Sequence, residues 1–189
     1  MAATGRQRRG LRRRPIPFAS VNRKGAPGYD AALQRHHLLP RQLRRLAWFA
    51  PLLDELGGAR IGLEDFRRNG MLLPAREAAA LRLALPLHRG PHRAYNELVA
   101  QRVGQIERRW SRARASGAER AAAEALMRLE LLQRALRRRL LDGRRRLVLN
   151  RRDPVGAGYD FAVMDALAET LWRASDPQTV LAESASFAA

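Results

Sequence analysis

Residues 88–110 read HRGPHRAYNELVAQRVGQIERRW, a polar, turn-prone start followed by a long regular pattern. Gly90 and Pro91 favour a loop that leads into a helix, because proline suits a first helical turn. Apolar residues then recur at steps of 4, 3 and 4, the spacing of one helix face: Val99, Val103, Ile106 and Trp110. We therefore predict a helix over 91–114, with two of the chain's four histidines at its start.

Outward from this stretch, the same kind of pattern predicts further helices. A long helix is expected over 118–142, where leucines share one face and Gly143 ends the pattern: Leu126, Leu129, Leu132, Leu136 and Leu140. Helical spacing is also found over 38–56, where Pro51 should kink the helix or start a second one, and over 75–83 and 159–172. Residues 71–73 fit a short buried strand. The predicted fold class is mainly α with a small β element.

The chain is strongly basic, and this bears on its partners. Lys and Arg number 36 against 18 Asp and Glu, which gives a formal net charge of +18 over 189 residues. All the basic residues but Lys24 are arginines, which form planar bidentate contacts with phosphate. A cationic surface of this strength indicates a nucleic-acid partner. The longest apolar run, Leu46 to Leu53, is far shorter than the roughly 20 residues of a membrane span.

Chemistry is concentrated in the histidines. The chain has no cysteine, so disulfides, thiolate metal sites and cysteine nucleophiles are excluded. The four histidines form two groups, the adjacent pair His36 and His37 and the pair His88 and His92. Adjacent histidines point in different directions, so one can hold a metal while the other acts as a base. Histidines four residues apart, near a helix start, can reach one ion.

Three runs resemble, in the same order, the motifs of the AHH nucleases, a branch of the HNH/endonuclease VII superfamily. QRHHLLP at 34–40 resembles the opening motif, with Arg35 where the family name expects Ala. NGMLLP at 69–74 resembles the central Asn-Gly motif. HRGPHRAYN at 88–96 resembles the closing His-x-Gly-x-His-x-x-Tyr-Asn motif. The resemblance covers about residues 35–103 and uses every histidine.

The resemblance implies a ββα-metal core, the HNH or His-Me finger, flanked by the long helices. In that fold a hairpin carries the His-His pair and the Asn, and a helix carries the last histidines around one divalent ion. It implies that His37 is the general base and that Asn69 orients its imidazole through a side-chain or a local backbone hydrogen bond. The implied metal ligands are His36, His88 and His92, with Asn96 as an alternative ligand or a neighbour of the ligands. Tyr95 is expected to pack or hydrogen-bond beside the site.

The chemistry of these residue types is consistent with those roles. A neutral imidazole, with an ordinary pKa of about 6.5, can accept a proton near neutral pH. Imidazole ligands favour Zn or Ni over Mg, whereas nucleases of this superfamily commonly use Mg or Mn, so the sequence leaves one divalent ion open among these four. Nearby arginines are expected to hold the nucleic-acid backbone: Arg35, Arg41, Arg89 and Arg93.

The chain divides, on this interpretation, into four parts. Residues 1–24, with eight basic residues and no acid, are expected to form a flexible basic arm. Residues 25–114 form the nuclease core, residues 115–175 a helical C-terminal extension, and residues 176–189 a frayed tail.

The leading hypothesis is a metal-dependent endonuclease that hydrolyses phosphodiester bonds, with DNA favoured over RNA. Two alternatives remain: a non-catalytic, Arg-rich nucleic-acid binder with a structural His-metal site, and a helical interaction protein whose histidines are structural. The partner is expected to be nucleic acid and not a membrane, and the C-terminal helices could form a homodimer. AHH domains occur as toxic tips of large secreted bacterial proteins, so an acidic inhibitor or immunity protein is expected if this chain is a toxin. The expected location is the cytoplasm, with export by a route without a signal peptide left open.

Overall fold

The computed structural model describes residues 14–143, 147–150 and 152–154. This part is mainly helical and contains a small antiparallel sheet of two strands, so the predicted fold class is confirmed. The expected helix over 159–172 and the expected tail lie outside the described residues. In chain order the elements are η1 (Phe18–Ser20), β1 (Leu33–His37), η2 (Arg41–Arg45), η3 (Ala47–Phe49), α1 (Ala50–Leu56), α2 (Gly58–Ile61), α3 (Phe66–Asn69), β2 (Gly70–Pro74), α4 (Glu77–Leu83), α5 (Arg93–Ala113), η4 (Arg114–Ser116) and α6 (Ala118–Leu141).

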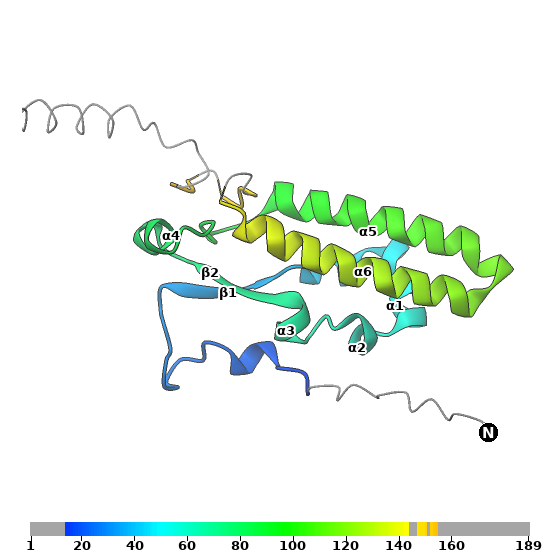
Figure 1. Cartoon of the computed structure of the whole chain (residues 1–189), viewed down its shortest axis with the longest axis horizontal. Helices are drawn as coiled ribbons and strands as arrows, with labels where there is room; N and C mark the ends of the chain where they lie inside the picture. Colours follow the sequence, from blue (N-terminus) through cyan, green and yellow to red (C-terminus); the bar gives the residue numbers. More distant parts are fainter. Residues whose placement is uncertain (1–13, 144–146, 151, 155–189) are drawn as a thin grey trace, which may run out of the picture. The chain divides into compact units, whose positions relative to one another are not determined.

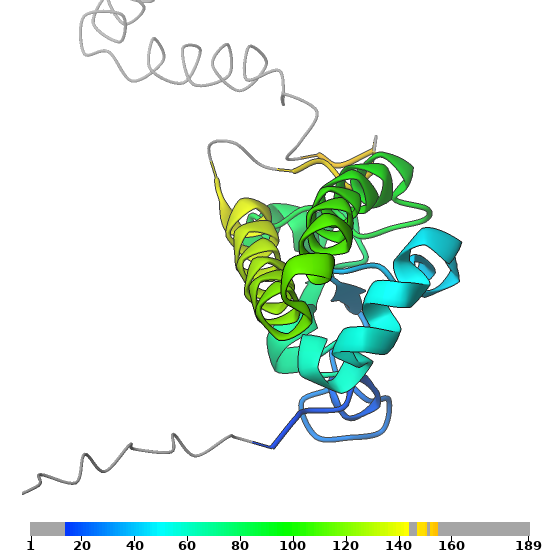
Figure 2. The same cartoon turned by 90° about the vertical axis from the view of Figure 1, so that its right-hand side faces the viewer.

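The two long helices α5 and α6 lie side by side as an antiparallel pair joined through η4 (Figures 1 and 2). Each buries the predicted apolar face: Val99, Val103 and Trp110 in α5, and Leu129, Leu136 and Leu140 in α6. α6 ends at Leu141, one residue before the predicted end, whereas α5 begins at Arg93, so Pro91 lies in the loop before the helix and His92 at its N-cap position. No helix in the described part of the chain is long and apolar enough to cross a membrane.

In segment 38–56 the helix expected before Pro51 is absent, and short 3-10 turns take its place; a separate helix does start beside Pro51, which is one of the two predicted outcomes. Pro40 precedes the 3-10 turn η2, η3 follows, and α1 starts afresh with Pro51 in its first turn. Each proline lacks a backbone N–H, so the chain restarts there and cannot continue a hydrogen-bonded ladder. The apolar residues of the segment still reach the core through these short turns: Leu43, Phe49, Leu52 and Leu56.

The sheet pairs two strands that are far apart in the sequence. β1 and β2 run antiparallel, with His36 opposite Met71 and His37 opposite Gly70. β2 includes the predicted strand 71–73, whereas β1 was expected only from the family resemblance. Neighbouring side chains of a strand point to opposite faces, and accordingly His36 is buried while His37 is half-buried. The sheet thereby separates the two adjacent histidines.

The N-terminal residues that the structure describes are attached to α3. Asp65 caps this helix, and its carboxylate accepts hydrogen bonds from Arg67 N and Ile16 N, both at 3.0 Å. Phe66 N in turn donates to Ile16 O at 2.7 Å. From there η1 reaches β1, where Phe18 stacks on His37 and Phe18 O accepts from Arg35. Residues 14–24 therefore have defined contacts, although the division of the chain into arm, core and extension stays a prediction.

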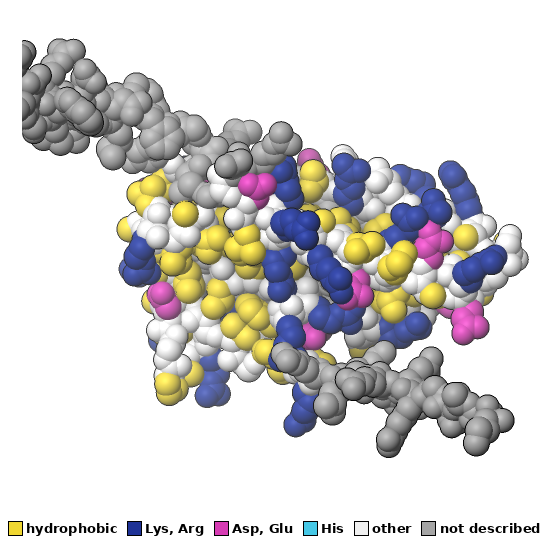
Figure 3. Space-filling model, in the orientation of Figure 1, with side chains coloured by type: hydrophobic (Ala, Val, Ile, Leu, Met, Phe, Trp, Pro, Cys, Tyr) yellow, Lys and Arg dark blue, Asp and Glu magenta, His cyan; other side chains and the backbone are white. Residues whose placement is uncertain are grey.

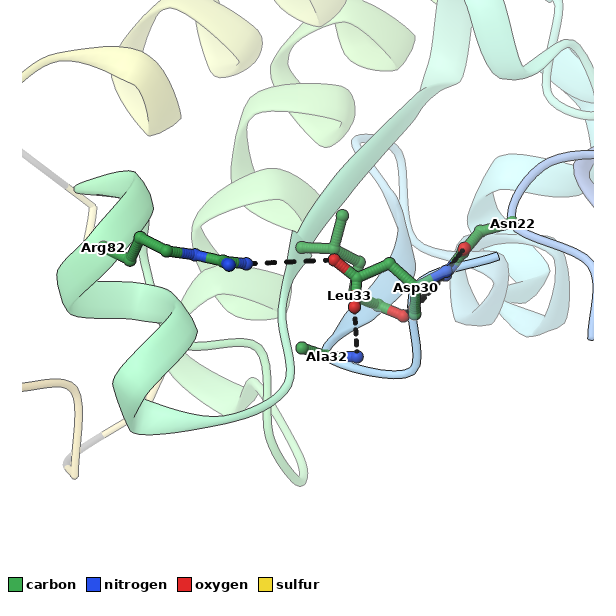
Figure 4. Close-up of polar contacts among 5 residues, drawn as sticks. All are labelled: Asn22, Asp30, Ala32, Leu33 and Arg82. Carbon is green, nitrogen blue, oxygen red and sulfur yellow. Dashed lines mark hydrogen bonds and ion pairs between the residues drawn. The ribbon is translucent and has the colours of Figure 1, made fainter. Parts of the chain in front are cut away.

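The loop before β1 closes around one asparagine (Figure 4). Asn22 Oδ1 accepts from Asp30 N, and Asn22 Nδ2 donates to Asp30 O and Leu33 O, at 2.8, 2.8 and 2.9 Å. Asp30 also accepts from Ala32 N at 2.8 Å and pairs with Arg82 of α4 at 3.9 Å. The loop is thus closed at the residue where β1 begins.

Candidate metal centre and active site

Three histidines from three segments lie together. His36 comes from β1, His88 from the loop after α4, and His92 from the cap of α5. One ring nitrogen of each lies within 4.8 Å of the corresponding nitrogens of the other two, close enough for the three to hold one metal ion. The ring centroids are 4.9 Å apart for His36 and His88, and 4.4 Å apart for His88 and His92. The sequence named these three residues as ligands, and the fold brings them together.

Hydrogen bonds orient two of these rings. His92 Nδ1 lies 3.2 Å from the carbonyl oxygen of Leu149, which only accepts, so Nδ1 must carry the proton. His88 Nδ1 lies 3.1 Å from Gln34 Oε1. In both rings this leaves Nε2 with a free lone pair, as metal-binding histidines require.

The third ring has a nitrogen without a partner. His36 Nε2 is buried and has no hydrogen-bond partner among the described residues. A buried polar atom is normally paired, and one that is not calls for an explanation such as an ion. The donor set and this atom both fit a divalent metal.

Burial keeps two rings of the cluster, His36 and His88, uncharged. It is the main reason why the pKa of His36 falls to about 2, with repulsion from His88 and His92 adding to it. Burial, followed by repulsion from His92, lowers the pKa of His88 to about 4. Both rings are therefore neutral at pH 7, and a neutral imidazole has the lone pair that a metal ligand needs.

His37 lies on the other face of β1, outside the three-histidine cluster. Its ring stacks on Phe18 of η1, with centroids 3.8 Å apart and planes 2° apart. Burial lowers its pKa; Glu64 opposes the shift, and Arg41 and Arg35 add to it. His37 is thus a neutral, oriented proton acceptor at neutral pH.

Asn69 fixes the backbone that follows His37. Its buried side chain accepts from Leu39 N at 2.7 Å and donates to Leu39 O at 3.2 Å and Leu63 O at 3.0 Å. Its own carbonyl accepts from Leu38 N at 2.8 Å. In the described structure the Asn69 side chain is occupied by these groups and by Gln133, not by the His37 ring. The sequence offered two ways for Asn69 to orient His37, a side-chain hydrogen bond to the ring or a hydrogen bond to the nearby backbone. The contacts observed for Asn69 are of the backbone kind.

Tyr95 holds the same short segment from the other side. Its hydroxyl donates to Leu38 O at 2.7 Å, and its ring meets His36 edge-on with centroids 4.9 Å apart. Burial raises the pKa of Tyr95 well above its usual range, so the hydroxyl stays protonated and remains a donor. Tyr95 therefore both packs and hydrogen-bonds beside the site. Asn96 lies next to it, partly exposed, with its N–H bonded to His92 O at 2.8 Å.

The arginines named from the sequence are all exposed: Arg35, Arg41, Arg89 and Arg93. Arg35 donates to Phe18 O at 2.8 Å, and both Arg35 and Arg41 are close enough to His37 to lower its pKa. Arg89 and Arg93 follow His88 and His92 directly in the chain. Figure 3 shows further Lys and Arg side chains spread over one face of the molecule, with acidic side chains interspersed.

Helix α6 also reaches this site, which the sequence did not indicate. Gln133 Nε2 lies 3.3 Å from Asn69 Oδ1. Arg137 donates to the carbonyls of Arg67 at 2.8 Å and Gly70 at 2.9 Å, and so binds the end of α3 and the start of β2. Gln133 interrupts the leucine pattern of α6 on its buried side, and that interruption is the signal that could have identified it.

The histidine cluster lies between a small sheet and the start of a helix, an arrangement compatible with a metal site of the HNH type. The sequence model of AHH, described as a nuclease family of the HNH/ENDO VII superfamily with conserved AHH, matches residues 18–136. The chain belongs to this nuclease family, and nucleic acid is accordingly its class of substrate. Neither a curated protein nor a solved structure matches the chain significantly.

Proposed function

We propose that the chain is a metal-dependent endonuclease that hydrolyses phosphodiester bonds, of DNA in preference to RNA. One observation carries the proposal: neighbouring histidines of β1 occupy opposite faces, and only one of them joins the three-histidine cluster. This arrangement separates a metal ligand, His36, from a proton acceptor, His37, while keeping them one residue apart. A hydrolytic nuclease needs both functions near the same phosphate.

His37 is the general base in this proposal. Its neutral ring accepts the proton of the water that attacks phosphorus, and Phe18 and the backbone at Leu38 keep the ring in place. Because burial disfavours the charged ring, the imidazolium formed in this step gives up its proton readily. Asn69 acts as a positioning residue through its bonds to Leu39.

His36, His88 and His92 would hold the divalent ion, with Asn96 as an alternative or neighbouring ligand. Such an ion, when bound, neutralises charge on the non-bridging and leaving oxygens of the phosphate. Three neutral nitrogen ligands favour Zn or Ni by softness, while Mg and Mn are the ions to compare with them.

The arginines supply contacts to the phosphates on either side of the cleaved bond. Arg35 and Arg41 lie near His37, and Arg89 and Arg93 adjoin the metal ligands in sequence. Each is exposed, so its guanidinium can form the bidentate contact that holds a phosphate.

A cleavage assay tests the proposal. Plasmid DNA, single-stranded DNA and RNA are incubated with the chain and Mg, Mn, Zn or Ni in turn, beside His37→Ala and His36→Ala. Loss of the base should reduce cleavage by about 10²–10⁴-fold while leaving metal binding intact, whereas His36→Ala should lose both. Undiminished cleavage by His37→Ala would remove this residue as the base. Salt-dependent binding without cleavage under every condition would instead support a non-catalytic binder.

A further inference from the structure

We infer that residues 147–154 form a strap that completes the metal centre, with Asp153 as its positioning residue. The inference rests on the proposed three-histidine metal site. The strap follows α6 and lies beyond residue 136, where the match to the family model ends. The structure describes it except at residue 151.

The strap contacts the loop that links the two later histidines at three points. The loop runs from Leu87 to His92 and contains no helix or strand. Three polar contacts hold its beginning, middle and end, across 66, 61 and 57 residues of sequence: Leu87 N to Asp153 Oδ2 at 3.1 Å, Arg89 O to Asn150 Nδ2, and His92 Nδ1 to Leu149 O at 3.2 Å. The loop is therefore fixed from outside along its length.

The strap is itself firmly anchored. The side chain of Leu149 is part of the hydrophobic core, and Asp153 is fully buried. Between them the chain makes a turn, in which Asn150 Oδ1 accepts from Arg152 N at 2.8 Å and Asn150 O accepts from Asp153 N at 3.0 Å. Burying a carboxylate costs free energy unless hydrogen-bond donors surround it. The bond from Leu87 N to Asp153 therefore fixes where this carboxylate lies.

These contacts determine how His92 meets a metal. Its Nδ1–H is held by the Leu149 carbonyl, which directs the lone pair of Nε2 toward the cluster. Gly90, with φ at +78°, sits in a conformation that favours glycine and marks a sharp bend between the two histidines. Outside the strap, the bend's backbone is held at its two ends, by His88 N donating to Pro74 O at 2.6 Å and by Asn96 N donating to His92 O at 2.8 Å, while the strap holds the part between them. Hydrogen bonds behind metal-bound histidines typically contribute 10–100-fold in metal affinity.

Calorimetry with Zn²⁺ alone, on the full chain and without nucleic acid, tests the strap. Asp153→Ala should weaken Zn²⁺ binding at least about tenfold. Asp153→Asn keeps an acceptor oxygen for Leu87 N and should restore most of the affinity. Arg152→Ala is the matched control, because its side chain is exposed and the strap uses only its backbone N–H. Wild-type affinity in Asp153→Ala, or equal losses in Asp153→Ala and Arg152→Ala, would overturn the inference.

Ring tautomers provide a readout that needs no metal. Long-range ¹⁵N–¹H spectra of the metal-free chain should show His92 protonated at Nδ1, and Asp153→Ala should shift it to a mixture of both tautomers. If Asp153→Ala does not fold, Asn150→Ala, at a partly exposed position, takes its place in both measurements with the same expected direction. A wild-type chain that binds no Zn²⁺ would contradict the proposed metal site. An unchanged His92 tautomer in the variants would contradict the inferred role of the strap.

Discussion

The ring of Phe18 lies flat on the imidazole of His37, with planes 2° apart. Phe18 belongs to η1, which Ile16 attaches to the start of α3. The aromatic ring thus covers one face of the proposed base and leaves its edge available. Phe18, which no motif includes, thereby limits the orientations of the ring that is proposed to act as the base.

Replacing Phe18 with alanine should slow cleavage without weakening the metal site. Aromatic pairs contribute about 0.5–1.5 kcal/mol, which corresponds to at most about a tenfold change in rate. Because burial lowers the pKa of His37, removing the Phe18 ring that covers the imidazole should also raise that pKa toward the ordinary value. The cleavage assay measures the rate, NMR titration measures the pKa of His37, and Zn²⁺ calorimetry measures the metal affinity. Phe18→Tyr, which keeps an aromatic ring, serves as the control. An unchanged rate and titration in Phe18→Ala would show that the stack has no role.

Acid should destabilise the metal-free chain over a defined range. His88 and His36 have folded pKa values of about 4 and about 2, below the value of about 6.5 in an unfolded chain. The unfolded state therefore binds more protons, and stability is lost as the pH falls from about 6.5 toward 4. The loss is at most about 1.4 kcal/mol per pH unit for each histidine. Melting curves at pH 7, 6 and 5 in the presence of a chelator should show this loss of stability, and His88→Gln should show a smaller loss. Equal losses in the wild-type chain and in His88→Gln would contradict the role of His88.

Asn69→Ala should be one of the most destabilising single changes. It removes the partners of Leu39 N, Leu39 O and Leu63 O, and a buried group left unpaired costs about 1–3 kcal/mol. We expect a loss of about 3 kcal/mol or more in the free energy of unfolding, measured by urea titration. Asn96→Ala, at a partly exposed position on α5, is the comparison. A change below about 1 kcal/mol in Asn69→Ala would mean that water replaces these bonds.

Gly70→Ala should disturb the proposed base from a distance. A Cβ at this position would lie 2.2 Å from Phe66 Cδ2, so the Phe66 ring must move. That ring meets Phe18 edge-on at 5.1 Å, and Phe18 stacks on His37. Overpacking of this kind costs about 1–3 kcal/mol.

The double variant Gly70→Ala with Phe66→Leu separates this clash from other effects of the added methyl group. Leucine removes the aromatic ring that the new Cβ would meet, so the double variant should be more stable than the sum of the single changes predicts. If the changes in the free energy of unfolding, measured in urea, simply add, the effect of Gly70→Ala does not come from a clash with the Phe66 ring.

The sequence predicted the cluster of His36, His88 and His92 because the chemistry restricts which residues can bind a metal. Four histidines, no cysteine and three ordered motifs left few combinations, and the long helices followed from clear periodicity. The part of segment 38–56 before Pro51 was wrongly predicted as a helix, because apolar spacing does not distinguish a helix from several short turns. β1 has no alternating pattern, since its residues read LQRHH.

The supporting contacts were harder to predict for a different reason. Leu149 acts through its backbone carbonyl, which any residue could supply. Phe18 lies in a stretch whose positive charge suggested a flexible arm. Gln34 becomes visible only once β1 is known, because it then shares a face with His36, two residues away.

The antiparallel pairing of α5 and α6 has a consequence for how the protein is made. Translation delivers all four histidines well before Leu149, and the intervening residues build the two long helices. Since the Leu149 carbonyl that contacts His92 follows α6 in the chain, the proposed centre can be completed only after α6 has been synthesised. On this reasoning, a growing polypeptide carries all the proposed ligands early but can complete the proposed site only when synthesis has passed Asp153.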